Sequence, residues 1–131
     1  MAEEHWLELE GDKWCSELSV DWPSYVEMEA EGSLISLAAR HGGELVGYSV
    51  TILCTPLYSD ELRTGVNSAI FLRKEHRCGG LGTRMILATE SAARQAGAKM
   101  MTWHAKPATS MAHVMEGMGY EVKTSNYSRG I

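Results

Sequence analysis

A cluster of glycines and arginines in the middle of the chain is the feature of the sequence best suited to chemistry. The segment HRCGGLGTRM, residues 76–85, follows an apolar run and precedes a segment with helical spacing. The first turn of a helix has backbone N–H groups without partners and attracts anions, and glycine lets a phosphate approach the backbone closely. The segment therefore favours a pyrophosphate site, although a plain glycine-rich turn with surface arginines would fit the same residues.

Two common phosphate-binding motifs do not match this segment. A P-loop requires Gly-Lys-Ser/Thr, which the sequence does not contain. A dinucleotide fingerprint requires a third glycine, but Gly80-Leu81-Gly82 continues with Thr83-Arg84. The chain also lacks the repeated strand–helix–strand units of a dinucleotide-binding fold. What is left is a strand, then Arg-x-x-Gly-x-Gly, then a helix.

Hydrophobic spacing and turn residues indicate the elements around this segment. Helices are expected within residues 1–19, 21–32, 81–97 and 108–119. Strands are expected over residues 33–40, 45–55, 65–74, 98–105 and 120–131, the first two joined by a hairpin at Gly42 and Gly43. This order of elements predicts a single α/β domain over residues 1–131, built from layers of sheet and helix.

The helix expected over residues 81–97 should bury one of its faces. Its spacing predicts that the following side chains lie together on that face: Leu81, Met85, Ala88, Ala92 and Gln95 or Ala96. Gly97 stands where a C-terminal cap belongs.

Composition and charge narrow the function classes. The 131 residues include 12 Lys and Arg against 17 Asp and Glu, so the net charge is −5, which disfavours nucleic acid as a partner while leaving room for a local basic pocket. Three cysteines without a Cys-x-x-Cys spacing predict neither a disulfide framework nor a metal site. The sequence shows no long apolar run and no basic leader, so we expect a cytoplasmic protein that does not enter a membrane.

The segment Arg77-Cys78-Gly79-Gly80-Leu81-Gly82, with the helix after it, resembles the acetyl-CoA signature of the GNAT N-acetyltransferases, Arg/Gln-x-x-Gly-x-Gly/Ala. The resemblance extends over roughly residues 33–127, and the run 55–72 also resembles compact members found in phage genomes. It implies the GNAT acyl-CoA N-acyltransferase fold, a mixed and mostly antiparallel sheet flanked by helices. It also implies direct transfer of an acetyl group from acetyl-CoA to a primary amine.

The same resemblance implies which residues bind the donor. The backbone of Phe71, Leu72 and Arg73 should pair with the pantetheine arm as an added strand would, and an N–H near Leu72 should face the thioester carbonyl. Arg77 should help to neutralise the pyrophosphate, which is held by the backbone N–H groups of Cys78, Gly79, Gly80, Leu81, Gly82 and Thr83. Two residues of the last helix lie along the other side of the cofactor: Ser110 and His113.

The groups that move protons are less well defined. The family often places a tyrosine in the last helix as the acid for the leaving thiolate, but here that position is Met115, which has no proton to donate. Tyr127, Tyr120 or water could replace it. His104 and Glu61 are candidate bases, and each also fits a simpler role, as a strand-end histidine and a solvated loop acid.

Two readings of the function therefore stay open. One is an active N-acetyltransferase whose acceptor is a small molecule, a host protein or a modified nucleobase. The other is a GNAT-fold protein with impaired catalysis that holds coenzyme A or binds a partner protein. A homodimer formed through residues 120–131 is compatible with both readings.

Overall fold

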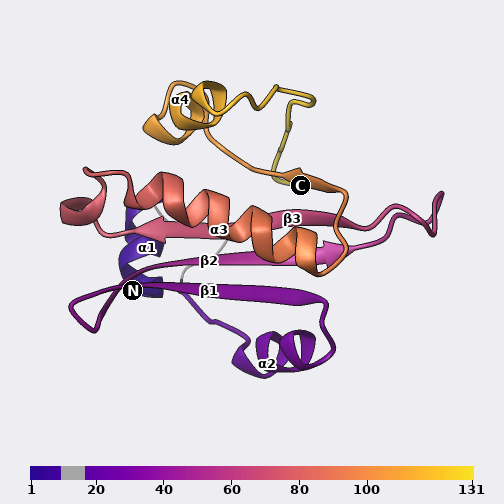
Figure 1. Cartoon of the computed structure of the whole chain (residues 1–131), viewed down its shortest axis with the longest axis horizontal. Coiled ribbons are helices and arrows are strands. Elements are labelled where there is room, and N and C mark those ends of the chain that lie inside the picture. Colours follow the sequence, from indigo (N-terminus) through magenta and orange to yellow (C-terminus); the bar gives the residue numbers. More distant parts are fainter. Residues whose placement is uncertain (10–16) are drawn as a thin grey trace. The chain divides into compact units, whose positions relative to one another are not determined.

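The computed structural model describes residues 1–9 and 17–131 (Figure 1). The chain separates into two compact units. The first contains Met1 and Ser19–His104, and the second contains Ala2–Leu18 and Ala105–Ile131. The sheet and the glycine turn both belong to the first unit.

Most of the predicted elements are confirmed. The first unit contains α2 (Trp22–Ala30), β1 (Leu34–His41), β2 (Glu44–Cys54), β3 (Thr64–Leu72), the 3-10 turn η1 (Lys74–His76), α3 (Leu81–Gln95) and β4 (Met100–Thr102). The second unit contains α1 (Ala2–Glu8) and α4 (Ser110–Gly117).

The two ends of the chain differ from the prediction. Within residues 1–19, a helix is seen only as α1, and residues 10–16 lie outside the described part of the chain. The strand predicted over residues 120–131 is wrong, because this segment has no regular secondary structure and is almost entirely exposed. An alternating pattern forms a strand only where the backbone finds a partner strand, and the pattern alone does not supply one.

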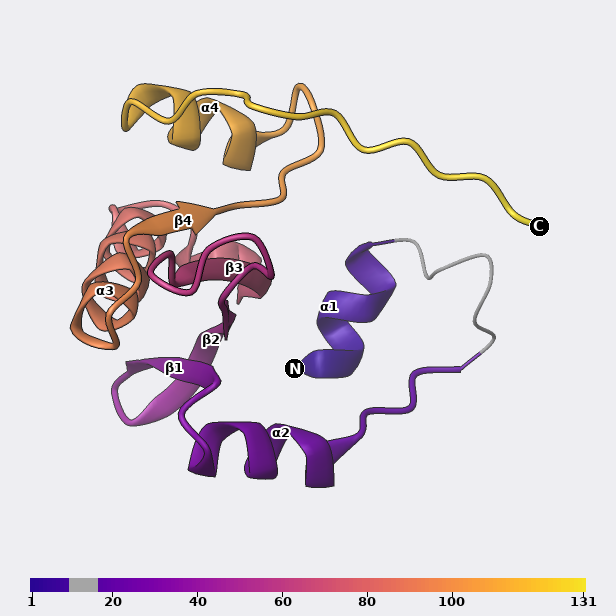
Figure 2. The same cartoon turned by 90° about the vertical axis from the view of Figure 1, so that its right-hand side faces the viewer.

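Within residues 1–9 and 17–131, four strands form one mixed sheet in the order β1-β2-β3-β4. The pairs β1–β2 and β2–β3 are antiparallel, and β3–β4 is parallel. Figure 2 shows α3 against one face of this sheet, and α2 packs beside β1. The predicted fold class, a mostly antiparallel sheet flanked by helices, is confirmed.

The buried face of α3 is displaced from the predicted one. Met85 is buried as expected, but its buried companions are Ile86, Thr89 and Ala93, whereas Ala88 is exposed. The prediction gave too much weight to alanines, which are apolar but small enough to be tolerated on an exposed helix face. Gly97 has φ +90° just after the helix, which confirms its predicted capping position.

No helix in the described part of the chain is long and apolar enough to cross a membrane.

Gly47 on β2 lies where no side chain fits. A Cβ atom there would come 2.7 Å from the carbonyl oxygen of Phe71 and 2.9 Å from a methyl carbon of Leu72. Because the first of these is backbone, it cannot move aside as a flexible side chain would. We expect Gly47→Ala to lower the free energy of unfolding by about 2 kcal/mol, measured by urea denaturation.

The control for this substitution is Gly117→Ala. Gly117 ends α4, and a Cβ there meets nothing within 4 Å. Alanine also has the higher helix propensity, so no loss of stability is expected. Equal stability of the two variants would contradict the close approach of β2 to β3.

Candidate functional site

The glycine turn before α3 adopts a backbone that favours glycine. Gly79 and Gly80 have φ values of +103° and +81°, in the left-handed region that other residues rarely adopt. Gly80 is the N-cap of α3, and no side chain caps the helix from this position. A Cβ built on either glycine meets no atom within 4 Å, so open space lies in front of the turn.

The first turn of α3 presents unused hydrogen-bond donors to this space. Its first intrahelical bond runs from the N–H of Arg84 to the carbonyl of Gly80, at 3.0 Å. The N–H groups of Leu81, Gly82 and Thr83 therefore precede the hydrogen-bonded part of the helix. Together with the partial positive charge of the helix start, they fit an anion of phosphate size.

Arg77 joins this turn to the end of β3. Its Nε donates to the carbonyl of Leu72 at 2.7 Å, and its guanidinium carbon lies 5.7 Å from the centre of the Phe71 ring. The backbone bond fixes the start of the side chain and keeps a formal positive charge beside the glycine turn. The structure thus brings together Phe71, Leu72, Arg77 and the turn.

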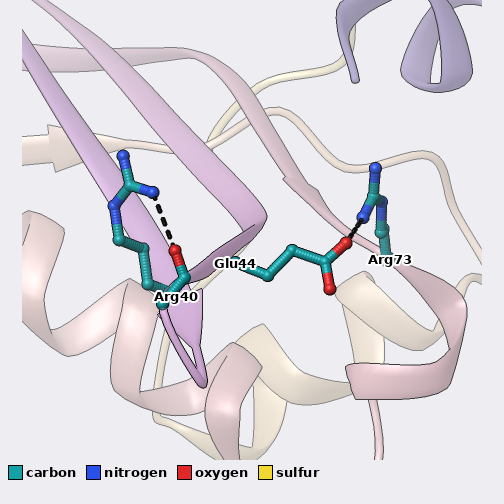
Figure 3. A network of polar contacts seen from close by, with 4 residues as sticks. Arg40, Glu44 and Arg73 are labelled. Atoms are coloured by element: carbon teal, nitrogen blue, oxygen red, sulfur yellow. Dashed lines mark hydrogen bonds and ion pairs between the residues drawn. The ribbon is translucent and has the colours of Figure 1, made fainter.

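Arg73 is directed toward the β1–β2 hairpin instead (Figure 3). Its Nη1 lies 2.8 Å from Oε1 of Glu44, and its backbone N–H donates to the carbonyl of Val46 at 2.9 Å. In the same hairpin, Nη1 of Arg40 donates to the carbonyl of Gly43 at 3.1 Å. The backbone N–H of Arg73 is therefore used by β2 and does not face the opposite edge of β3.

The alternation of an antiparallel strand then decides which backbone groups face the open edge. Because Arg73 bonds to β2, Phe71 also directs its N–H and C=O to β2, while Ile70 and Leu72 direct theirs to the other side. Ile70 was missed in the sequence, where the register of β3 against β2 could not be known. For backbone pairing at this edge, Ile70 and Leu72 replace the predicted Phe71 and Arg73.

The open edge begins where β4 leaves β3. The two strands pair only over three positions, from Thr64 with Met100 to Val66 with Thr102. Beyond Val66, this edge of β3 has no strand partner among the described residues. Residues 67–72 thus line a split in the sheet that ends at Arg77.

The candidate catalytic residues lie in different places. His104 is exposed two residues after the end of β4, in the first unit. Glu61 is exposed in the loop before β3, three residues from Thr64, where that strand starts. Tyr127 is exposed in the second unit, which also contains Ser110 and His113 of α4.

The methionine at the usual tyrosine position is a core residue of α4. Met115 is 6% exposed, and its carbonyl accepts a hydrogen bond from the N–H of Tyr120 at 3.0 Å. Among the residues of α4, Met115 is the only one that is buried. The departure from the family pattern thus coincides with a packing role for this side chain.

No group of three or more His, Cys, Asp or Glu side chains within residues 1–9 and 17–131 is placed to hold a metal ion.

Tyr48 contributes a pH-dependent term to stability. Its ring lies 6.1 Å from that of Phe71, and burial, followed by the charge of Tyr25, raises the pKa of its phenol. Because the pKa is raised in the folded state, the neutral phenol contributes to the stability of the folded protein. This contribution is complete below the unfolded pKa, about 10, and is lost as the pH rises through the folded pKa. We expect Tyr48→Phe to retain more of its stability than the parent protein above about pH 10, as measured by thermal unfolding.

Tyr58→Phe is the control, because the Tyr58 side chain is exposed. Its stability should follow that of the parent protein over the same pH range. If Tyr48→Phe and Tyr58→Phe behave alike, burial of the Tyr48 phenol is not the cause.

Comparison with known proteins supplies a second line of observation. A family model described as the acetyltransferase (GNAT) family matches residues 1–120. No curated protein sequence matches the chain.

Several solved structures share the fold. A ribosomal-protein-alanine N-acetyltransferase from Brucella melitensis biovar Abortus 2308 is 20% identical, with a TM-score of 0.63 over 76% of this chain and 70% of its own. An aminoglycoside acetyltransferase from an uncultured soil metagenomic sample, in complex with sisomicin, is 12% identical, with a TM-score of 0.75 over 98% and 85%. The aminoglycoside N-acetyltransferase AAC(6')-Iy, in complex with CoA, is 18% identical, with a TM-score of 0.62 over 84% and 90%.

Proposed function

The chain belongs to the acetyltransferase (GNAT) family and is an acyltransferase, and on that premise we propose that it moves an acetyl group from acetyl-CoA directly to a primary amine. The observation that carries the proposal is the start of α3, which no side chain at Gly80 caps and which opens onto free space beside the edge of β3 that has no strand partner among the described residues. The similar aminoglycoside N-acetyltransferase in complex with CoA supports coenzyme A as the carrier.

The donor would be held by two kinds of backbone group. The N–H groups of residues 78–83 would bind the pyrophosphate, with the charge of Arg77 beside them. Ile70 and the N–H of Leu72 would pair with the pantetheine arm, as an added strand would, while the carbonyl of Leu72 accepts from Arg77. Ser110 and His113 are proposed from the family resemblance alone as further cofactor-binding residues.

Acetyl transfer forms a bond between the amine nitrogen and the acetyl carbon and breaks the bond from that carbon to sulfur. A backbone N–H at the open edge of β3 would stabilise the charge on the carbonyl oxygen. His104 is the favoured base for the proton of the amine, because it follows β4 where the sheet splits. Glu61 is the alternative base, and Tyr127 would return a proton to the thiolate.

The acceptor is proposed from the neighbours and from the charge of the chain. The metagenomic structure with sisomicin favours a small molecule with primary amines. A net charge of −5 also favours a cationic acceptor over a nucleic acid. A host protein and a modified nucleobase are alternative acceptors that the sequence alone suggests. From the sequence alone we also propose a single domain over residues 1–131, a phage origin, a cytoplasmic setting and a homodimer.

Two measurements test the proposed activity. Calorimetry should show acetyl-CoA binding, with a rise in melting temperature of the complex. Thiol release should then be followed across a panel of amines, with aminoglycosides, polyamines and peptide N-termini as separate members. Absence of acetyl-CoA binding would overturn the proposal.

The second candidate function, a coenzyme A-binding protein with impaired catalysis, is favoured by Met115. This buried side chain stands where a proton donor is usual in the family. Tight binding of acetyl-CoA without thiol release for any amine would support this reading. Turnover with any acceptor would exclude it.

A further inference from the structure

β3 contains one residue more than β2 can pair with. Val50 pairs with Ala69, and the next residue, Thr51, pairs with Asn67, so Ser68 has no partner on β2. This is a β-bulge, and it lies just beyond Val66, the last residue that pairs with β4. The bulge therefore marks the start of the open edge that the proposed function uses.

The extra residue reverses the alternation of β3. Before the bulge, the residues that face α3 are Gly65, whose added Cβ would contact Ala93, and Asn67, which contacts Ser49. After it, Ile70 and Leu72 face α3 and pack with the buried core. Without Ser68 as an insertion, the pattern from residue 69 onward would be shifted by one. The bulge thus decides that Ile70 and Leu72 direct their backbone groups to the open edge.

The side-chain amide of Asn67 lies within hydrogen-bond distance of backbone carbonyls at this bulge. Its Nδ2 lies 3.0 Å from the carbonyl of Val50 and 3.2 Å from that of Ala69, the pair immediately beyond the bulge. It also lies 3.1 Å from Oγ of Ser49 and 3.5 Å from Oγ1 of Thr51, and its two hydrogens are shared among these acceptors. The residue is 4% exposed, so water cannot replace these bonds freely.

The amide also belongs to a buried network that reaches α3. Oγ1 of Thr89 lies 3.0 Å from Oγ of Ser49 and 2.8 Å from the carbonyl of Met85. Thr89 and Ser49 are each 1% exposed. A network of this kind fixes one arrangement of its members, because any change leaves a buried polar group without a partner. Thr89 lies at the α3 end of the network and Asn67 at the bulge end, so the two can be tested separately.

We propose that Asn67 is a positioning residue for the acyl donor. Its carboxamide holds the Ser68 bulge, and the bulge turns the backbone groups of Ile70 and Leu72 toward the pantetheine arm. This inference rests on the proposed function. It assigns to Asn67 an effect on the pantetheine half of coenzyme A and none on the nucleotide half, which the glycine turn binds.

The test compares two ligands by calorimetry: coenzyme A, and its nucleotide half alone, 3′-phospho-ADP. Asn67→Ala should weaken coenzyme A binding by about tenfold, as expected for the loss of about one well-placed hydrogen bond, and change binding of the nucleotide less than about twofold. Thr89→Val is the matched control: it removes a hydroxyl from the same network with little change in shape, and it should not change the ratio of the two affinities. If Asn67→Ala does not fold, Asn67→Ser, which retains a donor, should weaken coenzyme A binding about threefold without affecting the nucleotide.

The outcomes separate the two proposals. A parent protein that binds neither ligand would overturn the proposed function, and this inference with it. A parent protein that binds coenzyme A, with both affinities reduced equally or left unchanged in the Asn67 variant, would overturn the inference alone. An equal shift of the affinity ratio in Thr89→Val would also overturn it, since the effect would then belong to the network and not to the bulge.

Discussion

Gly80→Ala should weaken coenzyme A binding by about a hundredfold, measured by calorimetry. The structure shows open space where the new Cβ would stand, and the proposed pyrophosphate would occupy that space. Displacing the phosphates would cost at least two charge-assisted hydrogen bonds to backbone N–H groups, roughly 3 kcal/mol in total. Strain adds to the loss of stability, because alanine at φ +81° is disfavoured.

Gly32→Ala separates strain from binding. Gly32 has φ +75°, close to the value at Gly80, and a Cβ there also meets nothing within 4 Å. It follows α2, which is a different part of the first unit from the start of α3. Both variants should lose a similar amount of stability in urea denaturation, and only Gly80→Ala should lose affinity. Equal affinities for coenzyme A in the two variants would mean that the turn is a structural feature alone.

The sequence predicted the fold well where local signals were strong. The hairpin at Gly42 and Gly43, the helix after the glycine turn, and the cap at Gly97 each depend on a glycine with positive φ or on regular spacing. Such signals act within a few residues and need no knowledge of distant partners. The predicted strand over residues 120–131 failed because a strand depends on a partner edge elsewhere in the chain.

The same distinction applies to the site. Cys78–Thr83 were predicted from a contiguous motif, and the structure shows the open turn that the motif describes. The alternation of β3 was not predictable, because one unpaired residue, Ser68, changes which backbone groups face the edge. A weak signal was present: Asn67 is a poor strand former within an apolar run, which suggests a side chain with specific hydrogen bonds. Its partner Ser49 lies 18 residues before it in the sequence. Thr89, which bonds to Ser49, lies 40 residues after Ser49, and no local pattern connects the three residues.

Arg77→Met should weaken coenzyme A binding by about thirtyfold. The substitution keeps a long apolar side chain against Phe71 but removes the charge beside the glycine turn and the bond to the carbonyl of Leu72. A charge-assisted contact with phosphate contributes about 2 kcal/mol, which corresponds to that factor. The affinity of the parent protein should also fall more steeply with salt concentration than that of the variant.

Two further variants divide this effect into its parts. Arg40→Met removes another arginine that donates to a backbone carbonyl, in the β1–β2 hairpin, and should change the affinity less than about twofold. Arg77→Lys keeps the charge but loses the planar group that bonds to Leu72, so an intermediate affinity is expected. If Arg77→Lys matched the parent protein, charge alone would explain the role of Arg77. If it matched Arg77→Met, the bond that joins the end of β3 to the turn would be the essential part, since the glycine turn and the open edge would then no longer be held together.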